Sequence, residues 1–213
     1  MDQRMAAEEH LRVIRGLMER ATKYRAISAP TALVGGTLSI LLSTSLLFAP
    51  ASKNVADTAD FRAFVVAWLV VLMITLLANT FLIWRKSHRE GTGLLSNGLK
   101  LAVYSALPAV SAAALVTALL WSVQGGKDLS LLAVAVWILF YGLALLATST
   151  FAPHSIVVLG WAFLVSGFAA LIIAFDVWHP IANRPAALLM GLTFGLQHII
   201  YAILTWPRKT SSE

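Results

Sequence analysis

The side chains best suited to chemistry in this 213-residue chain are polar groups embedded in long uncharged segments. His198 is the histidine deepest within such a segment; Gln197 precedes it directly and Tyr201 follows one helical turn later. An imidazole inside a membrane can relay protons, contact a ligand or bind haem iron. Bis-histidine haem ligation needs a second histidine at similar depth, and the other histidines lie at segment ends or outside the segments. We therefore expect no cofactor.

Ser166 and His198, in consecutive uncharged segments, invite comparison with rhomboid-type intramembrane proteases, which use a serine and histidine dyad. The GxSG motif of that family corresponds to Leu-Val-Ser-Gly at 164–167, which lacks the first glycine. Ser166 lies about ten residues from the inner end of its segment and His198 about seven, a mismatch of about 5 Å at 1.5 Å rise per residue. We therefore expect no catalytic residue and no enzyme.

Other chemistry is disfavoured as well. Asp176 and His179 stand three residues apart, but two ligands alone do not make a metal site, and the adjoining Trp178 and Pro180 are typical of a span end. The chain has no cysteine, no phosphate-binding GxxxxGK[ST] loop and no HExxH pair. No carboxylate lies within a predicted membrane core, which argues against ion-coupled transport.

The elements that position these polar groups must come from five stretches without charged residues. The stretches are 26–52, 63–84, 101–126, 129–175 and 185–207. About 20 apolar residues cross the roughly 30 Å hydrocarbon core of a bilayer. The fourth stretch is long enough for two crossings, and Pro153 with its hydroxyl-bearing neighbours at 148–155 predicts a turn between them. The sequence thus predicts an all-α integral membrane protein with one domain over 29–207 and six transmembrane helices, at about 30–48, 63–84, 101–121, 129–147, 156–175 and 186–205.

The N-terminal residues 1–28 differ from the rest of the chain. Ten charges fall in the first 25 residues, while Leu11, Ile14, Met18 and Ala21 recur at helical spacing. This pattern predicts an N-terminal amphipathic helix that lies along the inner membrane surface or docks a cytoplasmic protein partner. Residues 208–213 are expected to form a short cytoplasmic tail.

The distribution of basic residues predicts the orientation. With the leader inside, twelve Lys and Arg residues fall on that side of the six predicted spans and four on the other. The excess places both termini in the cytoplasm and the protein in the plasma (inner) membrane. The net charge of +6 then reflects orientation and contact with anionic membrane lipids, and nucleic acid is not an expected partner.

Polar side chains gather in the cytoplasmic half of the predicted bundle, whereas the outer stretches 64–72, 131–140 and 168–175 are nearly pure hydrocarbon. Polar groups in lipid need hydrogen-bond partners, so these side chains either line a pocket open to the cytoplasm or bond between helices. The sequence leaves both alternatives open. The candidate solute-cavity residues are Asn79, Ser111, Tyr141, Gln197, His198 and Tyr201.

Small residues indicate where helices approach each other closely. Gly191 and Gly195 form a small-xxx-small pattern in the last span, whose face His198 and Ala202 would continue in a regular α-helix. Gly160 and Gly167 form a comparable stripe in the fifth span. We expect the fifth and sixth spans to pack together, most tightly from Gly167 onward, and a homo-oligomer is a further possibility.

The function predicted from these features is the binding or transport of a small uncharged or weakly polar solute through the inner-half cavity. The vitamin-binding membrane subunits of energy-coupling factor transporters are similar in size and span count, although no diagnostic motif is shared. The alternative is a regulatory or assembly subunit that transports nothing and acts through its N-terminal helix.

Overall fold

The structure, a computed structural model, describes residues 28–48, 58–90, 97–122, 129–175 and 184–206. Apart from short turns these residues are helical, which confirms the all-α prediction for the described part of the chain. The helices are α2 (Ala29–Phe48), α3 (Thr58–Glu90), α4 (Asn97–Ser122), α5 (Ser130–Leu146) and α6 (His154–Ala174), followed by α7 (Pro185–Met190), the π-helical segment η1 (Gly191–Gln197) and α8 (His198–Thr205). The predicted leader helix, the C-terminal tail and the Asp176–His179 pair lie outside the described residues.

Five of the described helical segments are long and apolar enough to cross a membrane: Ala29–Phe48, Phe61–Arg85, Leu99–Ser122, His154–Ala174 and Pro185–Thr205. The remaining apolar helix, α5, has 17 residues. At 1.5 Å rise per residue it is about 26 Å long, slightly less than a typical hydrocarbon core. A multi-pass membrane protein is thus supported, and α3 extends beyond its predicted span at both ends.

The turn predicted around Pro153 separates α5 from α6. Pro153 adopts an extended conformation, with ψ at 151°, directly before the first residue of α6. At the other side of the turn the buried hydroxyl group of Thr148 donates a hydrogen bond to the main-chain oxygen of Leu145 at 2.7 Å. The short connection makes α5 and α6 an antiparallel pair, the most extensive helix contact among the described residues.

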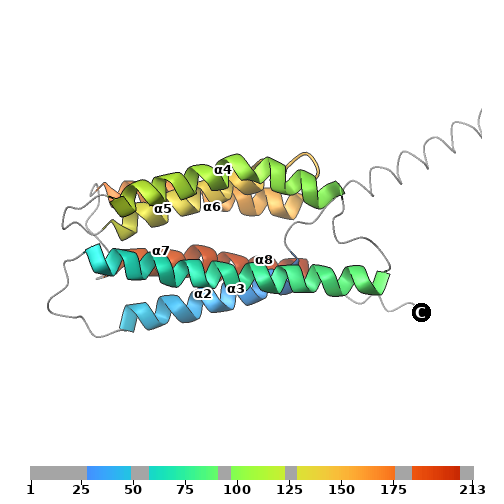
Figure 1. Cartoon of the computed structure of the whole chain (residues 1–213), viewed down its shortest axis with the longest axis horizontal. Coiled ribbons are helices and arrows are strands. Elements are labelled where there is room, and N and C mark those ends of the chain that lie inside the picture. The colour runs from blue at the N-terminus through green and yellow to red at the C-terminus, as the bar shows by residue number, and fades with distance from the viewer. Residues whose placement is uncertain (1–27, 49–57, 91–96, 123–128, 176–183, 207–213) are drawn as a thin grey trace, which may run out of the picture.

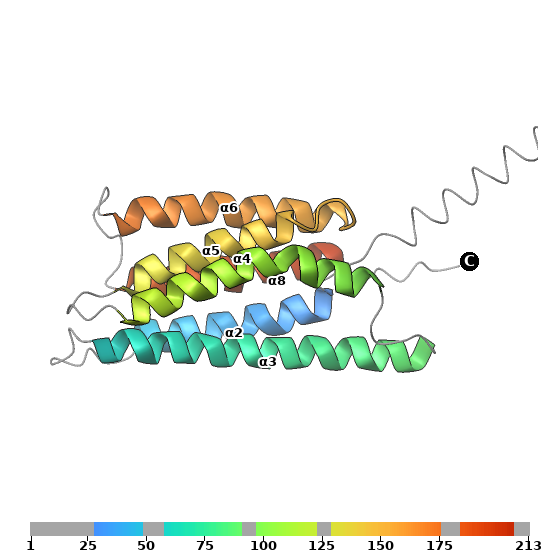
Figure 2. The same cartoon turned by 45° about the horizontal axis from the view of Figure 1, so that its top comes forward.

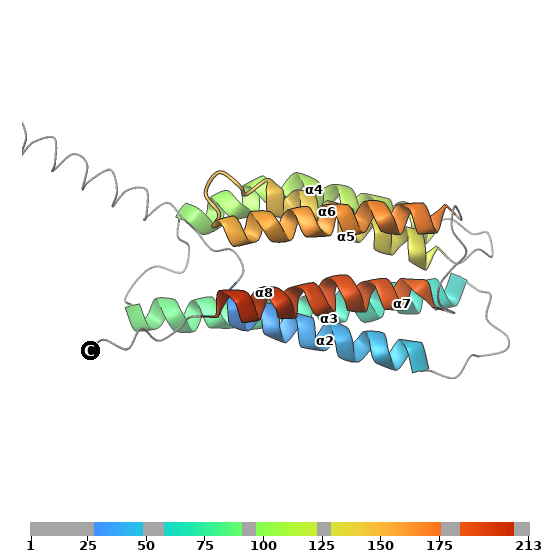
Figure 3. The ribbon, with the colours of Figure 1, turned by 180° about the vertical axis from the view of Figure 1, so that it is seen from behind.

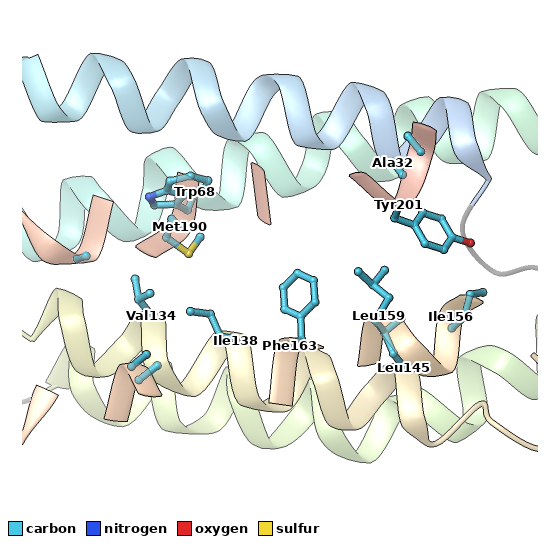
Figure 4. Packing of buried hydrophobic residues seen from close by; sticks show 14 of the residues in the cluster. Ala32, Trp68, Val134, Ile138, Leu145, Ile156, Leu159, Phe163, Met190 and Tyr201 are labelled. Atoms are coloured by element: carbon cyan, nitrogen blue, oxygen red, sulfur yellow. The ribbon is translucent and has the colours of Figure 1, made fainter. Parts of the chain in front are cut away.

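The helices form two layers (Figures 1 and 3). We call α2, α3 and the continuous rod α7–η1–α8 the first layer, and α4, α5 and α6 the second layer. The start of α2 and the end of α8 lie at the same end of the bundle, and α3 reaches farther than the other helices at that end (Figure 2). The interface between the layers, which we call the seam, contains most of the buried apolar cluster, including Trp68, Met190, Ile138 and Phe163 (Figure 4).

Within the first layer, glycines bring α2 close to the last rod. A Cβ atom on Gly36 would lie 2.9 Å from the main-chain oxygen of Gly195, and one on Gly195 would lie 2.6 Å from Cγ1 of Ile40. One on Gly191 would lie 2.9 Å from Cβ of Ser43. Only glycine leaves room for this approach, so the Gly191–Gly195 stripe contacts α2.

Within the second layer, glycines bring α5 and α6 together. A Cβ atom on Gly167 would lie 2.6 Å from Cγ of Leu139, one on Gly160 would lie 3.0 Å from Cγ of Leu146, and one on Gly142 would collide with the main chain of α6. The prediction that the glycine stripes of the fifth and sixth spans pack against each other is therefore wrong, because each stripe faces another helix. The short turn after α5 directs the α6 stripe toward α5, while the first span contributes Gly35 and Gly36, a surface that the prediction overlooked.

Candidate functional site

A tyrosine and a histidine meet across the seam. The hydroxyl group of Tyr141 on α5 lies 2.8 Å from Nε2 of His198, the first residue of α8. Either atom can donate the proton of this hydrogen bond, depending on the imidazole tautomer. His198 is buried, so the pair is a polar contact between the two layers within the membrane-spanning region.

The neighbouring residue makes a second polar contact across the seam. Nε2 of Gln197 donates a hydrogen bond to Oγ of Ser166 on α6 at 2.8 Å. The hydroxyl group of Ser166 in turn donates to the main-chain oxygen of Ala162 at 2.8 Å. Two adjacent residues of the last rod thus bond to two different helices of the second layer.

The π-helical segment η1 explains why these residues face the seam. In a regular α-helix Gly191, Gly195 and His198, spaced i, i+4 and i+7, would share one face. A π-helix has i→i+5 hydrogen bonds, which change the phase of every following residue. In the structure the face toward α2 continues from Gly195 to Ile199, whose Cγ1 approaches Gly36, and His198 points to Tyr141 instead. The expectation that His198 continues the glycine face is therefore wrong.

Aromatic rings enclose the tyrosine–histidine pair. The centroid of the Phe163 ring lies 4.7 Å from that of Tyr141, 5.1 Å from that of Phe194 and 5.3 Å from that of His198. The rings of Phe194 and His198 are stacked at 6.1 Å with an interplanar angle of 13°. We call Tyr141, Phe163, Phe194 and His198 the aromatic cluster. Its three other rings all contact the imidazole of His198.

Several buried polar atoms at the seam have no hydrogen-bond partner among the described residues. They are Oε1 of Gln197, Nδ1 of His198 and Nε1 of Trp68. Nδ1 of His198 still has the main chain of Phe194 and Thr193 close enough for weak hydrogen bonding, so Oε1 of Gln197 is the clearer case of an unpartnered atom beside the tyrosine–histidine pair. A buried polar group without a partner is destabilising, and the few cases in native proteins often mark functional sites or bound molecules.

The structure brings together some of the candidate residues and separates others. Tyr141, Gln197 and His198 meet at the seam, and Tyr201 is buried in the same core cluster (Figure 4). Asn79 lies within the first layer, where its Oδ1 accepts a hydrogen bond from Thr31 at 2.9 Å. Ser111 is exposed on α4. Asn79, Tyr141, Gln197 and His198 thus each make a hydrogen bond to another helix.

Disrupting the contact between Thr31 and Asn79 should weaken the first layer. We expect Thr31→Val and Asn79→Leu to show a coupling of about 1 kcal/mol in the free energy of unfolding, because interhelical hydrogen bonds in membranes contribute roughly 0.5–2 kcal/mol. A double-mutant cycle in mixed detergent micelles measures this value. Thr80→Val is the matched control, since the Thr80 hydroxyl bonds to Leu76 of its own helix. Full additivity of the Thr31 and Asn79 changes would contradict the prediction.

Sequence reasoning missed three parts of the site. Ser166 was considered only as a nucleophile, not as the partner of Gln197. Phe163 was not singled out as a candidate residue. Phe194 had a recognisable signal, because it stands four residues before His198, a spacing at which helical side chains are neighbours. The π-helical phase shift has no local sequence signal that we recognise.

Among the described residues no group of three or more His, Cys, Asp or Glu side chains is arranged to hold a metal ion. The contacts at the seam are hydrogen bonds between uncharged groups and contacts between rings. They can bind, orient or release a neutral molecule. Comparison of this chain with protein-family models, curated proteins and solved structures finds no match.

Proposed function

We propose that this chain is a plasma-membrane protein with six crossings and both termini in the cytoplasm, and that it binds or transports a small uncharged solute at the seam. The observation that carries the proposal is the buried, unpartnered Oε1 of Gln197, beside the hydrogen bonds that join the layers. A solute that replaced those hydrogen bonds could satisfy this atom as well.

The six rods of the bundle support the proposal of six crossings. Five meet the length of a span, and the sixth, α5, is apolar and packs extensively against α6. The excess of Lys and Arg supports the orientation. The alternative, a regulatory subunit acting through the leader, stays a prediction, because its residues lie outside the described part of the chain.

The chemistry of the seam favours an uncharged solute that carries a hydrogen-bond donor. The buried polar side chains of the described residues are hydroxyl groups and one imidazole, with no carboxylate, guanidinium or ammonium among them. A charged solute would lose its hydration here without meeting an opposite charge. Oε1 of Gln197 is purely an acceptor, so it requires an O–H or N–H group. The aromatic cluster favours a solute with a flat apolar portion.

Matched pairs of probes test this proposal, namely phenol with anisole and indole with 1-methylindole. Within each pair only one molecule has a donor. We expect the purified protein to bind phenol and indole about tenfold more tightly than their methylated counterparts, because a hydrogen bond to a buried acceptor contributes about 1 kcal/mol or slightly more. Isothermal titration calorimetry in detergent measures the affinities.

Gln197→Leu should abolish this preference, and Ser111→Leu is the matched control. Ser111 is exposed on α4, so its replacement should leave both affinities unchanged. Absence of binding by all four probes, or an equal effect of the two substitutions, would refute the proposed site.

A further inference from the structure

The close backbone contacts of this protein lie within the layers. Gly35 faces Thr75 of α3, and Gly36, Gly191 and Gly195 join α2 to the last rod, all in the first layer. Gly142, Gly160 and Gly167 join α5 to α6 in the second layer. Each of these seven glycines allows two helices to approach so closely that a Cβ atom would overlap the neighbour. A Cβ atom on Gly36, Gly142 or Gly167 would lie within 2.9 Å of a main-chain atom of the neighbouring helix. Main-chain atoms cannot change rotamer, so these contacts hold the helices of each layer at a fixed distance.

The contacts across the seam differ in kind from those within each layer. Its backbones approach closely at fewer places than those within each layer. Large side chains span it instead: the stacked rings of Phe64 and Trp137, with centroids 6.2 Å apart, connect α3 to α5, and Phe163 connects α6 to η1. Side chains of this kind can adopt other rotamers, so this interface can change while the layers keep their own packing.

The unpartnered polar atoms destabilise the closed state of the seam. Gln197 and Trp68 each bury an unsatisfied polar atom there. Opening the seam breaks the Tyr141–His198 and Gln197–Ser166 hydrogen bonds, but it also offers these atoms water or a solute. The polar contacts therefore stabilise the closed state less than a fully satisfied hydrogen-bond network would.

We infer that the two layers move as two bodies, and that the seam opens between them with the Tyr141–His198 and Gln197–Ser166 hydrogen bonds as its latch. The role of this opening in admitting a solute rests on the proposed function. The motion itself is a property of the bundle and can be observed without any solute. The latch residues of the first layer lie at the end of the π-helical segment, Gln197 as its last residue and His198 directly after it, which agrees with the frequent occurrence of π-helical turns at functional sites.

Distance measurements between spin labels test this inference, because the chain has no cysteine and every label position can be introduced singly. Tyr104 on α4 and Leu204 on α8, both exposed, form a pair across the seam. Leu77 with Leu204 reports on the first layer alone, and Tyr104 with Val158 reports on the second. Each residue is replaced by a labelled cysteine in the full chain, reconstituted into lipid bilayers.

We expect a single narrow distance for both pairs within a layer. For the pair across the seam we expect a second population, longer by roughly 5 Å, the scale of known helix rearrangements. Replacing Tyr141 by phenylalanine and Gln197 by leucine removes both latch contacts and should increase that population while the within-layer distances stay narrow. Broadening of all three pairs would mean that the layers are not rigid bodies, and this would overturn the inference.

A single narrow distance across the seam, in both the wild type and the latch-free variant, would also overturn it. These results are independent of the solute-binding test. If the spin labels show two distances across the seam but the protein binds the four probes with equal affinity, the inference stands and the proposed function is refuted. If the protein prefers phenol and indole but the distance across the seam is single and narrow, the proposed function stands and the inference is refuted.

Discussion

Replacing Phe163 by alanine should lower the free energy of unfolding by about 3 kcal/mol, near the low end of the range for buried phenylalanines, because lipid reduces the hydrophobic part of the loss. The Phe163 side chain is fully buried and contacts the three other rings of the aromatic cluster. Its removal leaves a cavity that the surrounding helices can fill only in part, since their spacing within each layer is fixed by glycine contacts. Unfolding by SDS in mixed micelles, followed by circular dichroism, measures the change.

Phe168→Ala is the matched control for this substitution. Phe168 lies on the same helix, and 56% of its side chain is exposed. Its replacement exchanges one lipid contact for another, so we expect a loss below about 0.5 kcal/mol. Equal losses for Phe163 and Phe168 would show that the aromatic cluster contributes no specific packing between the layers.

The helices of this protein could be predicted from its sequence because lipid leaves the backbone few choices. Uncharged stretches of spanning length must be helical to satisfy their own hydrogen bonds, and Pro153 among hydroxyl residues marks the one turn that interrupts them. The boundaries of α2 and α5 agree with the prediction within one residue at each end. The ends of α3 do not, because polar residues that lie outside a span can still continue a helix.

The pairing of the helices could not be predicted in the same way. Glycine stripes show that a helix has a close neighbour but not which helix that neighbour is. Gly191 and Gly195 face α2, which is far away in sequence, while Gly160 and Gly167 face α5, which is adjacent in the chain. Short connections favour adjacent pairs, but this rule does not distinguish the partners of the first and last rods.

Only part of the candidate site could be predicted, because a sequence pattern does not specify the direction in which a residue points. Polarity within a hydrocarbon segment identified Tyr141, Gln197 and His198, since such groups must find partners inside the bundle. The same argument also selected Asn79 and Ser111, which lie elsewhere, because depth along a span does not specify the direction in which a residue points. The direction of His198 depends on η1, and a phase assigned from a regular α-helix is wrong after a π-helical segment.

Replacing Gly142 by alanine should strongly disrupt the second layer, although it adds only a single methyl group. A Cβ atom there would lie 2.8 Å from the main-chain nitrogen of Leu164 and 2.9 Å from the main-chain oxygen of Gly160. Main-chain atoms cannot rotate away, so α5 and α6 must separate. We expect a net loss of about 2 kcal/mol in the free energy of unfolding, because overpacking costs up to about 3 kcal/mol and the helix propensity of alanine offsets up to about 1 kcal/mol.

Gly35→Ala provides the comparison that isolates the backbone contribution. A Cβ atom on Gly35 would lie 2.9 Å from Cγ2 of Thr75, a side-chain methyl group. A methyl group can shift where a main chain cannot, so the loss should stay below about 1 kcal/mol. Gly142→Ala should also leave the coupling between Thr31 and Asn79 unchanged, because that pair lies in the other layer and distant sites act additively. A changed coupling would mean that strain crosses the seam, which two separately packed layers would not allow.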